Sequence, residues 1–378
     1  MSYYSLLANE LTEVEKSLEP GAIAQEASVK DVPQSASKLG DFIYKNLSLS
    51  LISRHFDEAN IDRATLVGPH ANMQAGLYLG ENESFIFDIV GIQEFGSSQS
   101  RFGENVPSNG IFADEAYFKL RPNDKWQIDV GVINQAWLQN ELLFSSQPFP
   151  ALRFFYDLKA ANKLKTTLFF QYAMPTTTRI KTRTGANQEE PSSLAVGLSH
   201  ARQISKWQGK AHVYYYTIDD LPSEVAVESS LFGNTVNIPT TDTATFREDF
   251  AGLSFVLDLE YMRDDYTILL ILKSLKNLAT SSGFGFGQVV EFGATYLLQK
   301  KEQTLKFVYF FNESDTSVAS FNSYEYGHSN RLGYGLSLKH QFRESLAVKF
   351  KYITSKTINS SNVQNDITFW NLAATWTF

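Results

Sequence analysis

The sequence predicts an all-β protein in which about sixteen antiparallel strands close into an up-and-down barrel that spans a membrane. Three observations support this. From Asn46 onward, apolar and polar residues alternate with a period of two, as in strands with two different faces. The connections between the predicted strands alternate between short and long. The last segment, Ile367 to Phe378, has one apolar face that ends in aromatic residues.

Composition agrees with a barrel and disfavours a helical bundle. Aromatic residues make up 14% of the 378 residues, and the mean hydropathy is −0.22. No run of about 18 apolar residues could cross a bilayer as a helix, and the nearest candidate, Tyr266 to Leu272, is stopped by Lys273. Only the lipid face of a transmembrane barrel must be apolar, which permits this balance.

Residue usage excludes several classes of site. The chain has no cysteine, which excludes disulfides, thiolate catalysis and cysteine-ligated metals. A net charge of −8 argues against a nucleic-acid partner, and no cofactor is expected. Met1-Ser2-Tyr3 lacks the features of a signal peptide. We therefore expect that Met1 was added to a mature barrel chain.

Residues 1–45 form a separate predicted segment, and residues 46–378 form the predicted barrel. Leucines and Val14 recur at helical spacing before Pro20-Gly21, which ends the helix. We expect this segment to be a plug or a periplasmic arm, with a leader packed on the barrel base as the alternative.

The barrel strands are bounded by turns of two kinds, taken in chain order. Short polar turns are predicted at 80–83, 121–124, 160–162, 204–206, 263–265, 300–302 and 342–345. Long connections are predicted at about 55–69, 98–110, 136–150, 179–191, 221–246, 279–286, 316–330 and 356–366. This regular alternation is typical of a membrane barrel with short turns at one rim and long loops at the other.

The two faces of the strands decide which side meets water. In Phe250 to Tyr261 the apolar residues share one face, while Asp258 and Glu260 lie on the other. An unpaired charge in a dry interior costs several kcal/mol. Sixteen apolar strips exposed to water would exceed the few hundred Å² that soluble surfaces carry. Lipid outside and water inside satisfy both faces.

Residues 46–378 resemble the sixteen-stranded porin superfamily of Gram-negative outer membranes, on strand count, loop alternation and the terminal aromatic residues. The resemblance implies an outer-membrane location, contacts with lipid and lipopolysaccharide, and a homotrimer. It also implies passive diffusion of small polar solutes and ions. About sixteen strands leave room for an aqueous channel.

The resemblance also implies a constriction. In this superfamily the third external loop folds into the pore, and here the third loop is Ala136 to Pro150. Its expected constriction residues are Trp137, Glu141, Phe144 and Phe149. Packing against a neighbouring subunit or lipopolysaccharide is the alternative. Glu141 is the loop's single acid, so cation selectivity does not follow.

Alternation places charges of both signs on the water face. The candidate pore-lining residues are Glu115, Lys119, Asp129, Arg153, Asp157, Lys165, Asp258, Glu260, Lys306 and Lys349. Glu115, Asp129 and Arg153 are the first candidates because they flank the third loop; each could also be an ordinary solvated wall residue. Tyr78, Tyr117, Tyr214 and Tyr216 could form a stacking path for a sugar.

Three other functions stay open at this stage. A substrate-specific transporter of hydrophobic compounds with an N-terminal plug fits residues 1–45, although the hatch motif Asn-Pro-Ala of such channels is missing. An enzyme is disfavoured because the chain contains no G-x-S-x-G or H-E-x-x-H motif. Acidic loops could serve adhesion or calcium binding, without the spacing of an EF-hand.

Overall fold

The structure is a computed structural model. It describes residues 42–59, 62–96, 109–161, 164–175, 190–237, 243–281, 283–298 and 301–378. The helix predicted within residues 1–45 lies outside the described residues. The last four residues of that predicted segment, 42–45, belong to the first strand.

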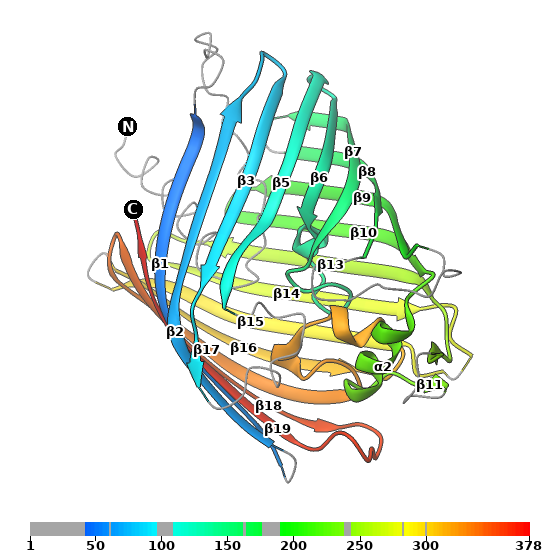
Figure 1. The fold of residues 1–378 in the computed structure, drawn as a ribbon. Coiled ribbons are helices and arrows are strands. Elements are labelled where there is room, and N and C mark those ends of the chain that lie inside the picture. The colour runs from blue at the N-terminus through cyan, green and yellow to red at the C-terminus, as the bar shows by residue number, and fades with distance from the viewer. Residues whose placement is uncertain are drawn as a thin grey trace.

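Sixteen long strands of the described chain form one antiparallel sheet (Figure 1). They are β1 (Phe42–Glu58), β2 (Asp62–Tyr78), β3 (Glu83–Ile92), β5 (Gly110–Asn123), β6 (Trp126–Asn134), β7 (Pro148–Ala161), β8 (Leu164–Ala173), β9 (Ser192–Ile204), β10 (Trp207–Asp219), β13 (Phe250–Met262), β14 (Tyr266–Asn277), β15 (Phe286–Leu298), β16 (Lys301–Asn312), β17 (Arg331–Arg343), β18 (Leu346–Thr357) and β19 (Ile367–Thr377). Short elements are β4 (Phe95–Gly96), β11 (Val236–Asn237), β12 (Thr245–Phe246), helix α2 (Ser223–Leu231) and the 3-10 helices η3 (Gln135–Leu138), η4 (Ala319–Phe321) and η5 (Tyr324–Tyr326).

The sheet closes on itself through its first and last strands. β19 pairs with β1 without a register shift, from Ser48 opposite Thr377 to Glu58 opposite Ile367. The Phe378 amide donates to the Leu47 carbonyl at 2.9 Å, which extends the seam to the last residue. The predicted fold class, a closed antiparallel barrel of about sixteen strands, is confirmed.

β3 and β4 are two parts of one wall segment, interrupted opposite a proline. Their pairing with β2 keeps the same register on both sides of the gap. Pro69 has no amide to donate, but its carbonyl accepts from the Gln93 amide at 3.0 Å. A side chain at Gly68 would lie 1.9 Å from the Gln93 carbonyl oxygen. Glycine at this position therefore allows the interrupted strand to approach.

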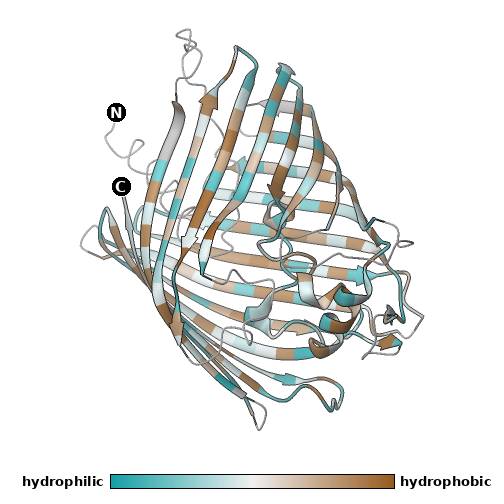
Figure 2. Cartoon of the chain, viewed as in Figure 1, coloured by the Kyte–Doolittle hydropathy of each residue, from teal (hydrophilic) through white to brown (hydrophobic). Residues whose placement is uncertain are grey.

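The two faces of the wall differ as predicted (Figure 2). On β13, Leu253 is 47% exposed while its neighbour Ser254 is 1% exposed. On β16, Phe307 and Tyr309 point outward and are about half exposed. Near the short turns, Trp126 stacks on Tyr156 on the outside of the barrel at a ring distance of 4.6 Å. The outside is thus an apolar band edged by aromatics, as lipid contact requires.

The short turns predicted at 80–83, 121–124, 204–206, 263–265 and 342–345 fall at connections between consecutive strands, and those at 160–162 and 300–302 lie partly outside the described residues. The long loop expected at 55–69 is wrong. β1 continues to Glu58 and β2 begins at Asp62. The period-two alternation does not end there, because Phe56 and Leu66 both point inward and are buried. The strands were missed because their outward face is polar near this rim. His55 and Thr65, which are hydrogen-bonded at 2.7 Å, lie on this face. Among the described residues, no helix is long and apolar enough to cross a membrane.

Candidate functional site: the barrel lumen

The inner face of the barrel carries the charged residues that alternation predicted. Even-numbered residues of β13 face inward, since Ser254 is contacted by a loop that lies inside the barrel. Residues paired across neighbouring strands point to the same face, so the facing of β13 can be followed from strand to strand around the barrel. On this basis all ten candidates point inward: Glu115, Lys119, Asp129, Arg153, Asp157, Lys165, Asp258, Glu260, Lys306 and Lys349. Whether each lines the path of a solute remains a prediction.

The connection between β6 and β7, residues 135–147, folds into the lumen. It begins with η3, where the Asn134 side chain caps the helix by accepting from the Ala136 amide at 2.9 Å. The loop then crosses to the far wall, where Asn140 donates to Ser254 on β13 at 2.9 Å. A Cβ on Gly287 of β15 would lie 3.1 Å from Leu142. Of the four expected constriction residues, Phe149 lies on β7 instead of in the loop.

Glu141 ties this loop to the wall and to a second loop. One carboxylate oxygen accepts from Lys273 Nζ at 2.5 Å, and the other accepts from the Tyr326 hydroxyl at 2.9 Å. Lys273 also lies 3.6 Å from Glu291 on β15. Sequence reasoning did not propose Lys273 as a site residue, because an apolar run precedes it. Lys273 lies two residues before the inward-facing Leu275, and this spacing could have predicted that Lys273 also faces inward.

The connection between β16 and β17, residues 313–330, also turns inward. The Tyr216 hydroxyl on β10 donates to the Thr316 carbonyl at 3.0 Å. Tyr326 stacks near Phe310 of β16 at 4.6 Å, and Lys351 of β18 forms an ion pair with Glu325. The long connection predicted at 316–330 is present, but it folds into the lumen instead of extending away from the rim. Residues 313–330 contact the inner faces of three strands, so they narrow the lumen.

The predicted loop at 221–246 contains helix α2, which packs on residues 313–330 (Figure 1). Ser229 donates to Ser320 at 2.9 Å. The Asn234 amide group donates to the carbonyls of Ser314 and Ser317 at 2.6 and 2.8 Å. Asp315 accepts from Thr235, and burial raises the pKa of its carboxyl. The three connections thus form one packed assembly.

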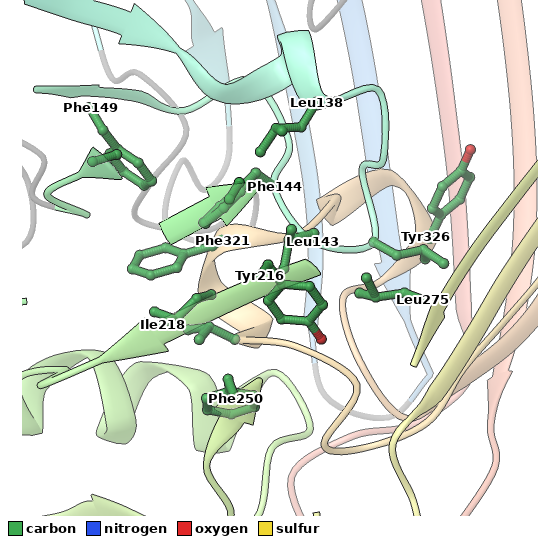
Figure 3. Packing of buried hydrophobic residues seen from close by; sticks show 14 of the residues in the cluster. Leu138, Leu143, Phe144, Phe149, Tyr216, Ile218, Phe250, Leu275, Phe321 and Tyr326 are labelled. Atoms are coloured by element: carbon green, nitrogen blue, oxygen red, sulfur yellow. The ribbon is translucent and has the colours of Figure 1, made fainter. Parts of the chain in front are cut away.

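An apolar cluster fills the space between these connections (Figure 3). Phe144 from the first and Phe321 from the second lie 6.0 Å apart, and Phe149 completes the group at 5.6 Å from Phe321. Tyr214 and Tyr216 are 1% and 0% exposed at its edge. The suggestion that these tyrosines form a sugar path is wrong, because packed side chains cover their rings.

Asp129 and Arg153 form a buried pair at the base of the first loop. Arg153 donates to Asp129 at 3.0 and 2.6 Å, and both side chains are at most 3% exposed. The guanidinium carbon lies 4.8 Å from the ring centre of Trp137. Trp137 in turn donates to Gln171 at 2.7 Å. This pair therefore positions the start of the loop.

The basic residues of the lumen wall are unevenly distributed. β3, β5 and β6 carry the inward carboxylates Asp88, Glu115 and Asp129 together with the base Lys119. The inward positions of β17, β18 and β19, all of them described, carry basic residues and no carboxylate: Arg331, Lys339, Lys349 and Lys351. Within the described ranges, no group of three or more His, Asp or Glu residues could hold a metal ion.

No protein-family model matches the sequence, and no curated protein sequence matches it. Solved structures share its fold. The high-pH structure of OprB from Pseudomonas putida aligns with a TM-score of 0.57 at 11% identity, over 90% of this chain and 94% of that one. In-vitro folded OmpT, an outer membrane protein of Vibrio cholerae, aligns with a TM-score of 0.51 at 11% identity, over 88% and 97%. The chain is a closed sixteen-stranded antiparallel barrel with the fold of these bacterial outer-membrane proteins.

Proposed function

We propose that the protein is an outer-membrane channel through which small polar solutes and ions diffuse passively, without a cofactor or a catalytic step. The observation that supports this best is the contrast between the two faces of the closed barrel. The outside is apolar and suits lipid, while the inside carries charges of both signs together with inward-folded loops. Such a lumen needs water, and loops that reduce its width select solutes by size and charge.

Lipid and lipopolysaccharide are the proposed partners of the outer wall. Large apolar side chains such as Phe292, Phe307 and Tyr334 are more than half exposed there. A homotrimer would cover part of this wall, and chemical cross-linking in detergent would test it. For residues 1–45 we propose a plug or a periplasmic arm.

The aromatic cluster raises the transporter of hydrophobic compounds as a second candidate. Its largest members, including Phe149, Phe321 and Tyr216, are 0% exposed and pack on one another. A binding surface would leave area for a ligand. We therefore assign the cluster to the core of the loop assembly and favour the polar channel.

Single-channel conductance in a planar bilayer tests the proposal, with the full chain compared with a chain lacking residues 1–41. Stable ohmic steps from both chains are expected. They would mean that residues 1–41 form an arm outside the pore. Steps only after the deletion would make it a plug. Silence from both chains would reject the channel and favour the transporter.

A further inference from the structure

The short-turn rim of the barrel carries its charges unevenly. Between β5 and β10, its described side chains include five exposed bases, which we call the basic arc: Arg121, Lys125, Lys165, Arg202 and Lys206. The described acids of these turns are Asp124 and Asp157, so five bases against two acids give this sector a net charge of +3.

The other short turns have the opposite balance. At 79–83, 263–265, 301–302 and 342–345, the described residues include three bases against six acids, a net charge of −3. The rim therefore has a basic sector and an acidic sector.

The bases of the arc belong to three neighbouring hairpin turns. The Lys125 carbonyl accepts from the Asp157 amide at 2.9 Å, which joins the first turn to the second. Lys165 Nζ lies 3.5 Å from the Asp157 carboxylate. Leu164, the residue before Lys165, is the cross-strand partner of Arg202, which leads into the third turn. The basic arc is thus one continuous surface along the rim.

Part of the basic arc lies on the lumen side of the rim. Arg121 Nε donates at 3.0 Å to Gln127, a buried residue of the inner face, and Lys165 also faces inward. On the outer side of the same rim, Trp126 and Trp207 are 44% and 54% exposed, at the level where aromatic residues meet the lipid interface. An acidic ligand at the barrel mouth can therefore reach bases that face away from lipid.

The chain supplies an acidic segment at this rim. Residues 1–41 contain seven acids and three bases, a net charge of −4. Four of these acids lie in the stretch before Pro20 that is predicted to be helical: Glu10, Glu13, Glu15 and Glu19. β1 begins at Phe42, opposite Leu77 of β2, at the same rim as the short turns (Figure 1).

The segment is long enough to reach the basic arc. β2 and β3 separate β1 from β5, and three strand spacings place the near end of the arc about 15 Å along the wall. Residues 20–41 span about 25 Å as a flexible chain. The turn nearest to β1 carries Glu81 and Glu83, which repel an acidic segment.

We propose that the basic arc is the docking surface for the acidic segment formed by residues 1–41 of the same chain. Attraction between opposite charges holds the segment on one sector of the rim and leaves the rest of the mouth open. This inference specifies the arm among the two roles proposed for the segment, and it does not depend on conduction.

Carbodiimide cross-linking of the full chain in phosphatidylcholine vesicles tests the docking. The reagent joins a carboxylate to a lysine amine in direct contact, and peptide mass mapping identifies the linked pair. R121Q/R202Q lowers the charge of the basic arc without removing a lysine. R263Q/R343Q makes the same change of charge in the other sector and is the matched control. Heat-modifiable migration on gels verifies folding of each variant.

We expect links, within one chain, between acids of residues 1–41 and lysines of the turns between β5 and β10. R121Q/R202Q should lower their yield about fivefold, and R263Q/R343Q less than about twofold. Molar KCl should lower the yield in the wild type about tenfold, because salt screens exposed charges.

Links mainly to the lumen lysines Lys306 and Lys349 would overturn the docking and make the segment a plug. Equal effects of the two arginine pairs would also overturn it. So would loss of the links in vesicles that contain phosphatidylglycerol, because anionic lipid would then occupy the basic arc. A conducting wild type that forms none of these links would overturn the docking and leave the channel intact.

Discussion

At the scale of single residues, buried charge pairs hold the lumen loops. Arg153 donates two hydrogen bonds to Asp129, and both side chains are at most 3% exposed. The guanidinium carbon lies 4.9 Å from the ring centre of Phe155 and 4.8 Å from that of Trp137. Removing one partner of such a pair leaves an uncompensated buried charge. These two residues therefore act on the constriction through Trp137, which sits at the start of the loop.

R153M should lower the free energy of unfolding by about 3–5 kcal/mol and shift the Trp137 emission to longer wavelength. Urea unfolding in lipid vesicles and tryptophan fluorescence measure the two effects. R263M, at an exposed arginine near a short turn, is the matched control. The double variant D129L/R153M should recover most of the loss. Equal stability of R153M and R263M would contradict the assignment.

His328 is the residue through which acid should loosen residues 313–330. Its ring stacks on Phe232 at 4.1 Å and bonds the Ala319 carbonyl at 2.8 Å. Burial, helped by nearby Arg331, lowers the pKa of His328 from 6.5 to about 3. When the loop opens, His328 would bind a proton near its ordinary pKa of 6.5. The free energy that favours the closed loop therefore decreases as the pH falls from 6.5 toward 3. The slope is about 1.4 kcal/mol per pH unit.

Hydrogen exchange of residues 313–330 at pH 7 and pH 5.5, corrected for intrinsic rates, measures this slope. All variants are compared in a D315N background, because Asp315, whose pKa is raised in the folded state, acts in the opposite sense. H328F should remove the pH dependence, whereas H200Q, at an outward-facing histidine on β9, should keep it. If H328F kept the full pH dependence, a group other than His328 would be responsible for it.

At the scale of elements, the lumen is narrowed by three connections that hold one another. Residues 135–147 reach residues 313–330 through the Ser145 amide and the Phe321 carbonyl at 2.8 Å. Helix α2 reaches the same segment through Ser229 and Ser320. Each connection is anchored by the others, so the assembly should behave as a unit during conduction.

A disulfide between α2 and η4 tests this rigidity. The hydroxyl oxygens of Ser229 and Ser320 lie 2.9 Å apart, and the chain has no cysteine to interfere. S229C/S320C should oxidise readily, as thiol titration would show. Its conductance should equal that of the reduced form, because α2 and η4 are already in contact in the folded protein. Closure of the channel on oxidation would mean that α2 and η4 separate when solutes pass.

At the scale of the whole molecule, much of the architecture was predictable and the interior was not. The alternation of Leu253 and Ser254 was enough to assign each face, because lipid and water impose opposite demands on neighbouring residues. Strand register and loop contacts were beyond reach. Asn140 meets Ser254 across 114 positions of the chain, and no local pattern in either segment indicates that pairing.

The same limit explains the errors in the predicted site. Tyr214 and Tyr216 face inward as parity requires, but parity cannot say that loops folded into the lumen bury them. Lys306 was predicted to face inward. Its alignment with Lys351 became visible only through Ser337, which pairs with both. Which face of a strand a residue occupies is a local property, whereas a binding surface depends on contacts between distant segments.

The bilayer should enforce the assignment of faces over the whole barrel. Val213 lies at the middle of β10, points outward and is 45% exposed. Ser199, on neighbouring β9, is the cross-strand partner of inward-facing His212. V213R places an ion in the hydrocarbon layer, which costs about 2–4 kcal/mol near the midplane. S199R places the same ion on the lumen face, which the proposed channel fills with water.

Urea titrations of the folded barrel in lipid vesicles should therefore show a loss of about 2–4 kcal/mol for V213R and less than about 1 kcal/mol for S199R. In detergent micelles, which deform around a charge more easily than a bilayer, the difference between the two variants should shrink. A larger loss for S199R than for V213R would mean that the lumen at this level is dry. The channel would then be closed at β9 and β10, and conduction would depend on the opposite wall alone.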